Sequence, residues 1–395
     1  MTALKEVFVV SAVRTAIGTF GGSLKDTPLN ELATLVVKEA LARAAVAPEK
    51  VGHVVLGNVI PTEPMDAYLS RVAALSAGMP VTTPAFNVNR LCGSGVQAIV
   101  SAAQNVALGL CDIAVAGGAE SMSRGPYLMQ SARWGARMGD TQLLDYTVGV
   151  LHDPMHKIHM GVTAENVAEE FGVSRVDMDS LAAESHRRAA AATESGYFQS
   201  QIVPVQIVKS RQSITFKVDE HVKGETTVEA LAKMKPAFKK DGSVTAGNSS
   251  GVNDGAAALV LASAEAIKAH GLTPLARLVS YGHAGVEPKI MGIGSVPAAR
   301  QALQRAGLSV SDLATVEANE AFAAQACAVT RQLELDPAIV NPNGSGISLG
   351  HPIGATGAII STKAIHELHR IGGKYALVTM CIGGGQGIAA VFERV

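Results

Sequence analysis

The chain has 395 residues, of which 48% are hydrophobic and 17% charged, and its 33 Lys and Arg residues balance 34 Asp and Glu residues. This interleaved balance leaves no basic face for nucleic acid, and no uncharged apolar stretch reaches the roughly 18 residues of a membrane span, so neither partner is expected. The length corresponds to two or three domains, and the low charged fraction favours an oligomer.

Short β-branched runs alternate with helical patterns along the chain, which predicts an α/β fold. The predicted strands lie at Val7–Val10, Val54–Val59, Ile113–Val115, Leu259–Leu261, Leu275–Val279, Val316 and Ala376–Met380. The predicted helices lie at Leu29–Ala45, Val96–Leu110 and Pro297–Ala306. The first strand is too short for a signal peptide, and the C-terminus carries no peroxisomal tripeptide, so a bacterial cytoplasm is the expected location.

Two parts of the chain repeat the same order of elements. The run Ala40–Ala44 recurs as Ala302–Ala306, and at the same offset Val51 and Val54 match Leu313 and Val316. Later, each part has a glycine-rich turn, a helix of small residues and an apolar strand that ends in glycines. The preserved order predicts two homologous α/β halves.

Between the two parts, roughly from Ser121 to Ser250, the composition changes to a more polar segment with Trp134, several Arg and a helical pattern at Met178–Thr193. Such a segment is typical of an inserted loop domain that caps a core. We therefore expect a first half at 1–120 plus 251–272, a loop domain at 121–250 that binds the substrate, and a second half at 273–395.

Cys92 lies at the entrance of the helix predicted from Val96. A thiol at a helix N-terminus faces unpaired N–H groups and the positive end of the helix dipole, which favour the thiolate. The alternative is a buried cysteine that acts as one more small hydrophobe, and this segment alone does not decide between them. The cysteines of the chain include no C-x-x-C pair, so neither a zinc site nor a disulfide framework is predicted.

His351 lies in a turn crowded by Gly350, Gly354 and Gly357, where a planar ring could approach a ligand closely. A histidine is the natural base for a cysteine, although a histidine that is only hydrogen-bonded in a tight loop is the alternative. Asn319, at a predicted strand end, is polar in an apolar neighbourhood, which indicates either a role in a site or a helix N-cap.

Cys381 ends the last predicted strand and precedes a run of glycines. Residues Gly385 to Ala390 match the dinucleotide pattern G-x-G-x-x-A, but too few residues follow for the helix and the acidic residue that this site requires. The glycines are better explained as a floor under the substrate whose N–H groups face an oxyanion.

Taken in order, Cys92-Gly-Ser-Gly, Asn319-Glu-Ala-Phe-Ala, Gly350-His-Pro-Ile-Gly and Cys381-Ile-Gly-Gly-Gly resemble the thiolase family over essentially the whole chain. The resemblance implies the thiolase fold: two mixed-sheet α/β halves, each with five strands, in layered α-β-α-β-α packing with an inserted loop domain. It is closest to bacterial β-ketothiolases of the acetoacetyl-CoA and 3-ketovaleryl-CoA type. A homotetramer is the family expectation.

The resemblance also implies a two-thiol mechanism without a metal or other cofactor, in which the coenzyme A thioester is the substrate. Cys92 takes the acyl group after His351 removes its proton, and Cys381 deprotonates the second acetyl-CoA. Asn319, through a bound water, and His351 form one oxyanion hole, and the backbone N–H groups of Cys92 and Gly383 form the other. By the same resemblance, the contacts of the CoA arm and thioester are Leu151, His159, Met160, Lys223, Phe238, Ala246, Ser250, Met291 and Phe322.

Several alternatives stay open at this point. A thiolase that degrades longer 3-ketoacyl-CoA chains would carry the same motifs. A fatty-acid condensing enzyme would share the fold but use two histidines in place of the second cysteine, which Cys381 argues against. A non-catalytic acyl-CoA-binding protein would have no reason to keep both thiols together with His351.

Overall fold

The centre of the fold is a pair of neighbouring antiparallel strands, one from each predicted half. A computed structural model describes residues 4–209 and 212–395, and in it β1 (Val7–Thr15) pairs with β14 (Ala276–Gly285). The strand order β15-β16-β17-β14-β1-β13-β5-β3-β4 continues outward from this pair in both directions. The two sides of the pair carry matching strands, as a duplicated unit would.

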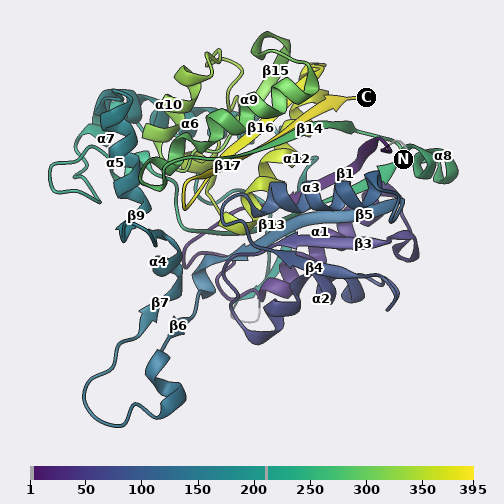
Figure 1. Ribbon diagram of the computed structural model, residues 1–395, viewed down its shortest axis with the longest axis horizontal. Coiled ribbons are helices and arrows are strands. Elements are labelled where there is room, and N and C mark those ends of the chain that lie inside the picture. The colour runs from purple at the N-terminus through teal and green to yellow at the C-terminus, as the bar shows by residue number, and fades with distance from the viewer. Residues whose placement is uncertain (1–3, 210–211) are drawn as a thin grey trace.

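Each half combines strands with helices on both faces, and the inserted segment has helices and strands of its own (Figure 1). The first half contains β1, β2 (Gly18–Thr19), α1 (Leu29–Ala44), β3 (His53–Gly57), α2 (Leu69–Ser76), β4 (Ala85–Val88), α3 (Ser94–Ala107), β5 (Ile113–Ser121), β13 (Asn253–Ser263) and α8 (Ala264–His270). The second half contains β14, α9 (Ser295–Ala306), β15 (Leu313–Ala318), α10 (Ala323–Gln332), α11 (Gly346–Leu349), α12 (Ile353–Ile371), β16 (Tyr375–Ile382) and β17 (Gln386–Arg394).

The inserted segment lies between β5 and β13 of the first half. It contains β6 (Tyr127–Leu128), β7 (Leu144–Asp145), α4 (Tyr146–Val150), β8 (His152–Asp153), β9 (Ile158–His159), α5 (Met160–Glu170), α6 (Arg175–Glu194), β10 (Ile202–Val203), β11 (Val205–Lys209), β12 (Gln212–Phe216) and α7 (Val228–Ala232). In Figure 1 the part around β6 and β7 projects away from the two halves, whereas α5, α6 and α7 pack beside the second half. The boundaries at 120, 250 and 272 stay our proposed division of the chain.

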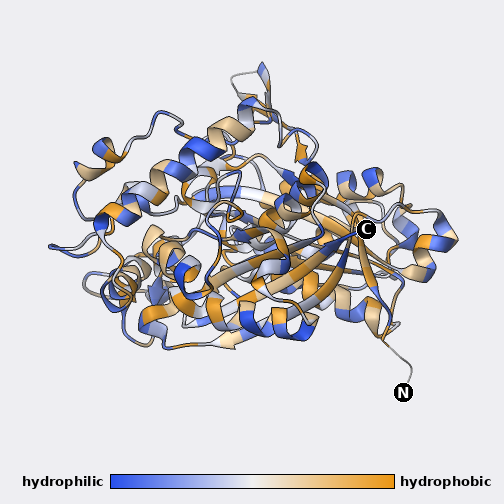
Figure 2. Ribbon diagram, turned by 90° about the horizontal axis from the view of Figure 1, so that it is seen from above, coloured by the Kyte–Doolittle hydropathy of each residue, from blue (hydrophilic) through white to orange (hydrophobic). Residues whose placement is uncertain are grey.

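The helices and sheet form five layers. α1 and α9 cover the outer faces of the first and second halves, while α3 and α12 lie between the halves, contacting each other and strands on either side. Figure 2 shows hydrophobic residues concentrated on the central strands and mixed residues on the peripheral helices. The structure therefore confirms the predicted α-β-α-β-α fold.

Two glycines set how closely the inner helices approach. A Cβ on Gly95 would lie 2.4 Å from the backbone nitrogen of Ala358, and a Cβ on Gly357 would lie 2.4 Å from that of Val96. Real Cβ atoms do not come that close to backbone, so only glycine permits this crossing. The register that matches Ala40 with Ala302 also matches Gly95 with Gly357, so the contact is symmetric.

The predicted strands and helices are all present, with ends that differ by a few residues. The expected five strands are found in the first half, but in the second half the place of β4 is taken by an isolated bridge between Val316 and Val340. α10 was not predicted because its small and polar residues give no apolar periodicity. In the described ranges, no helix is both long and apolar enough to cross a bilayer.

Candidate active site

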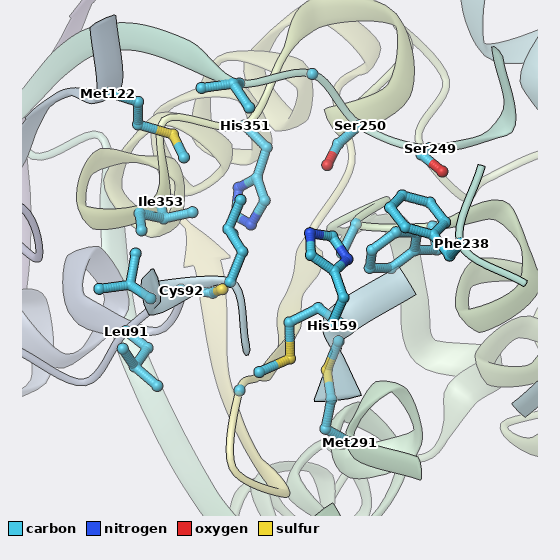
Figure 3. A pocket seen from close by; sticks show the side chains of 18 residues that line it. Leu91, Cys92, Met122, His159, Phe238, Ser249, Ser250, Met291, His351 and Ile353 are labelled. Carbon is cyan, nitrogen blue, oxygen red and sulfur yellow. The ribbon is translucent and has the colours of Figure 1, made fainter. Parts of the chain in front are cut away.

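A cavity of about 230 Å³ lies where both halves meet the inserted segment (Figure 3). Of the predicted site residues, the cavity is lined by Cys92, Leu151, His159, Met160, Phe238, Ser250, Met291, Phe322, His351 and Gly383. Asn319 and Cys381 are fully buried next to this lining, as described below. The fold thus brings together residues that are widely separated in the sequence.

Cys92 stands just before the inner helix of the first half. α3 begins at Ser94 with Gly93 as its N-cap, and Leu91 adopts a left-handed φ of 46° that turns the chain before the thiol. Burial raises the pKa of the Cys92 thiol to about 11, while the backbone N–H groups of Gly383 and of Cys92 itself lower it. The N–H groups favour the thiolate, as expected, but burial outweighs them, so Cys92 is a thiol near neutral pH and needs a base.

His351 lines the same cavity, and Thr356 sets its tautomer. Its Nδ1 lies 2.7 Å from the hydroxyl oxygen of Thr356, whose own proton is donated to the carbonyl of Pro352 at 2.8 Å. Since that hydroxyl has one proton, it can only accept from Nδ1–H, which leaves the lone pair of the imidazole on Nε2. Burial lowers the pKa of His351 to about 4, so the ring is neutral near neutral pH.

Asn319 lies beside this free nitrogen. It follows β15, and its Nδ2 is 3.4 Å from Nε2 of His351. Its Oδ1 is buried and has no hydrogen-bond partner among the described residues. α10 takes Phe322 as its N-cap, so the helix-cap alternative for Asn319 does not hold. The Asn319 amide therefore contacts the His351 ring.

Cys381 lies near the end of β16, close to Cys92, but does not line the cavity wall. Burial, and next the neighbouring Cys92 thiol, raise the pKa of Cys381 above its usual range. The glycine run then turns the chain into β17, with positive φ angles at Gly384 and Gly385. The residues of the dinucleotide pattern, Gly385 to Ala390, therefore lie in a turn and in the strand that follows it.

The outer part of the cavity is aromatic and apolar. The His159 ring stacks on Phe238 at 4.7 Å between centroids, and Phe238 meets Phe322 edge-on at 6.0 Å. The backbone N–H of Gly161 donates to Nδ1 of His159 at 3.0 Å, and burial lowers the pKa of this histidine. Such walls suit an uncharged, flexible chain better than a charged group.

Two predicted contacts do not line the cavity. Lys223 donates its backbone N–H to Nδ1 of His186 at 3.2 Å, and its neighbour His221 stacks with His186. Ala246 is exposed at the start of a 3₁₀ helix, Ala246–Asn248. Their expected contacts with the nucleotide end of the substrate stay predictions.

Sequence reasoning missed residues whose roles depend on the fold. Thr356, which orients the His351 ring, could have been suspected from its place in the same glycine-rich motif. Asn253 accepts the backbone N–H of His351 at 2.9 Å, but nothing in its local sequence indicates this. Further lining residues that were not predicted are Leu91, Met122, Val150, Ser249, Gly251, Val252, Ala321 and Ile353. Among described residues, no three His, Cys, Asp or Glu side chains gather as a metal site would require.

Family models divide the chain into two matches. Residues 7–265 match the model described as "Thiolase, N-terminal domain", and residues 272–394 match "Thiolase, C-terminal domain". The chain is 66% identical to Beta-ketothiolase BktB of Cupriavidus necator, covering 99% of this chain and 100% of the relative. It is 46% identical to the human mitochondrial 3-ketoacyl-CoA thiolase, covering 100% of this chain and 99% of the relative.

Solved structures have the same fold over the whole chain. The acetyl-CoA acetyltransferase of Bacillus anthracis superimposes with a TM-score of 0.98 at 49% identity, and each chain is covered fully. The human mitochondrial 3-ketoacyl-CoA thiolase in complex with CoA superimposes with a TM-score of 0.96 at 46% identity, covering 100% of this chain and 99% of that one.

Proposed function

The chain belongs to the thiolase family, and from this premise we propose that it is an acetyl-CoA C-acyltransferase that condenses and cleaves acyl-CoA thioesters reversibly. The observation that carries the residue roles is the shared cavity of Cys92, His351 and Gly383, with Cys381 behind it. The relatives named beta-ketothiolase and acetyl-CoA acetyltransferase support the same reaction class.

In the first half-reaction, Cys92 attacks the thioester carbonyl of acetyl-CoA. Nε2 of His351 takes the thiol proton, because Thr356 holds the other ring nitrogen protonated. The acyl group passes to Cys92, and CoA leaves as a thiol with the proton from His351. A neutral imidazole is required for this step, and burial keeps His351 neutral.

In the second half-reaction, Nε2 of His351, which is free again, takes the proton of the Cys381 thiol, and the Cys381 thiolate removes a proton from the methyl carbon of a second acetyl-CoA. The resulting carbanion attacks the acyl carbon on Cys92, the bond from that carbon to the Cys92 sulfur breaks, and acetoacetyl-CoA forms. The Cys92 thiolate takes its proton back from His351, and Cys381 is left as a thiol. Burial raises the pKa of Cys381, so its thiolate is a stronger base than an ordinary one, as a weakly acidic carbon requires. Thiolysis is the same sequence in reverse.

Negative charge develops on a thioester oxygen in both half-reactions. The backbone N–H groups of Cys92 and Gly383, which lower the pKa of the Cys92 thiol, are our proposed donors for the acyl oxygen. Asn319, through a bound water, and His351, whose Nε2 carries a proton at that stage, are the proposed pair for the enolate oxygen, and the two side chains lie 3.4 Å from one another. Preorganised donors of this kind lower a barrier by about 3–4 kcal/mol each.

Intact-protein mass spectrometry after incubation with acetyl-CoA tests this proposal. We expect one acetyl adduct that maps to Cys92 and is absent from Cys92→Ala. Cys327→Ala is the matched control, because Cys327 is a buried thiol of the chain to which no role is assigned. An unmodified parent protein, or a Cys92→Ala protein that is as active as the parent, would contradict the proposal that this chain transfers acyl groups through Cys92.

The acyl length is a finer question. The 66% identity to a beta-ketothiolase exceeds the 46% identity to a 3-ketoacyl-CoA thiolase, so we propose a preference for short chains. Thiolysis rates with acetoacetyl-CoA, 3-ketovaleryl-CoA and longer substrates test it, and a rate that rises with chain length would favour the degradative alternative.

The family and its bacterial members support three further proposals, which are CoA binding along the aromatic wall, a homotetramer and a cytoplasmic location.

A further inference from the structure

We propose that Glu120 is a positioning residue for acyl transfer. Its carboxylate, at the end of β5 in the first half, holds the N-terminus of α12 and with it the His351 segment of the second half. This inference deepens the proposed function and rests on the roles of Cys92 and His351 given above.

The carboxylate of Glu120 is fully buried and receives four hydrogen bonds. Its Oε1 accepts from Nδ2 of Asn58 at 2.8 Å and from the backbone N–H of Ile60 at 2.9 Å. Its Oε2 accepts from the backbone N–H of Val59 at 3.1 Å and from that of Gly354 at 2.7 Å. Three of these donors follow β3, and the fourth is the second residue of α12. One side chain therefore joins two segments from different halves.

All four partners donate, so only the ionised carboxylate matches them. A protonated oxygen would direct its hydrogen at another N–H group. Burial raises the pKa of Glu120 to about 8 although the backbone donors Ile60, Gly354 and Val59 lower it, and this value would leave the carboxyl group mostly protonated at neutral pH. We assign the ionised form on the geometry, because four donors and no acceptor surround the two oxygens. The free N–H groups and the positive dipole end of α12 favour a negative charge at this place.

Glu120 and the first turn of α12 are tightly packed against each other. A Cβ on Gly354 would lie 2.4 Å from Oε2 of Glu120, and a Cβ on Gly118 would lie 2.3 Å from the carbonyl oxygen of Gly354. The first turn of α12 is thus held tightly from the first half. A shift of Glu120 is passed to Gly354, and from there to Ile353 and His351, both of which line the cavity.

The charge of Glu120 also reaches the nucleophile, because it raises the pKa of Cys92. The other titratable groups around these two are Asp254 on β13, which raises the pKa of Glu120, together with Cys381 and His351. Glu120 therefore opposes a thiolate on Cys92 in the absence of substrate, which leaves proton removal to His351.

The duplication shows that the fold itself does not need a carboxylate here. The register that matches Ala40 with Ala302 places Ile382 opposite Glu120. Ile382 packs at the entrance of α3, where a Cβ on Gly93 would lie 2.5 Å from its Cδ1. An apolar side chain suffices at the thiol side, whereas a costly buried charge is used at the histidine side.

Two substitutions of Glu120 test separately the contribution of its negative charge and that of its side-chain length. Glu120→Gln keeps the length but loses the charge and turns an NH₂ group toward donors, and Glu120→Asp keeps the charge but is too short to hold both segments. We expect each to lower kcat for thiolysis roughly 100-fold, the loss typical of a misplaced catalytic group. KM for acetoacetyl-CoA is expected to stay within about twofold, because the proposed CoA contacts lie elsewhere.

A second measurement records the alkylation of Cys92 by iodoacetamide against pH. Loss of the negative charge in Glu120→Gln is expected to move the midpoint to lower pH, and Glu120→Asp is expected to keep it. A purely structural role would not produce this split.

The matched control is Glu165→Gln. Glu165 is another buried carboxylate that joins two segments, since it accepts from the N–H groups of Ser243 and Val244 at 2.8–2.9 Å. We expect a similar loss of Tm but a kcat within about threefold of the parent. If both Glu120 variants keep kcat at the level of this control, the proposal is overturned, and if Glu120→Gln does not fold, Glu120→Asp decides alone. A parent protein that forms no acetyl-Cys92 would instead contradict the proposed function.

Discussion

The two halves of the molecule place different chemistry on the same element. Each half directs one inner helix at the shared cavity, and the two helices cross at Gly95 and Gly357. In the first half the residue before the helix entrance is Cys92, and in the second half it is His351. A duplicated scaffold thus brings the proposed nucleophile and its proposed base together, although they are far apart in the chain.

The halves differ most in the connections after their matching strands. After β5 the chain enters the long segment that supplies the aromatic wall of the cavity, including His159 and Phe238. After β16 it turns at once through Gly383, Gly384 and Gly385 into β17. In our proposal, the first connection supplies the wall that binds the substrate, and the second supplies a backbone donor. Function in this fold therefore arises where the repeat is broken.

The largest expected effect comes from Cys381→Ala, which breaks the division of labour between the halves. This variant is expected to form acetyl-Cys92 at a normal rate but to lose condensation by roughly 10⁴-fold, because no base remains for the methyl proton. Single-turnover acylation and steady-state condensation measure the two steps separately. Equal condensation by Cys381→Ala and Cys327→Ala would remove the role of Cys381.

Asn319→Ala tests whether the strand end of the second half contributes an oxyanion donor. We expect kcat to fall by roughly 10²–10³-fold, the loss that accompanies removal of one donor. Acylation of Cys92 is expected to change much less than condensation, because the proposed donors of the acyl oxygen are Cys92 and Gly383. An equal loss of rate in acylation and in condensation would instead show that Asn319 acts only by holding His351, through their 3.4 Å contact.

Gly95→Ala and Gly357→Ala test the shared crossing. Each added methyl group would meet backbone at 2.4 Å, so each is expected to destabilise the fold by about 3 kcal/mol. The double variant is expected to lose less than the sum, because both relieve strain by the same separation of the helices. Chemical denaturation measures these values. Gly149→Ala is the control, since a Cβ there meets nothing within 4 Å.

The smallest expected effect is on the acid side of the pH profile. Burial lowers the pKa of His351 to about 4, so the base stays neutral until the pH falls through that value. At pH 5.5 kcat/KM is expected to be nearly full, whereas a histidine of ordinary pKa would leave roughly a tenth. Between these two pKa values the unfolded chain binds more protons, so stability is expected to rise with pH there. An acid limb near pH 6.5 would contradict this placement of His351.

Much of the fold can be predicted from the sequence because it depends on local patterns. Alternation of β-branched runs with helical periods predicted the α/β class, and the recurrence of Ala40–Ala44 as Ala302–Ala306 predicted the two halves. The second half was harder to predict, because α10 lacks apolar periodicity and because the strand that would correspond to β4 is only a bridge at Val340. Small, uniformly buried residues carry no amphipathic signal, so pattern alone cannot identify them.

The sequence by itself determined which residue types the site has: two thiols and a histidine in glycine-rich turns, and an amide at a strand end. Only the tertiary structure decided their states. Burial overrides the helix entrance and raises the pKa of Cys92 to about 11, and the single proton of the Thr356 hydroxyl fixes the tautomer of His351. Glu120 connects segments from the two halves, so its role depends on contacts that no local sequence pattern records.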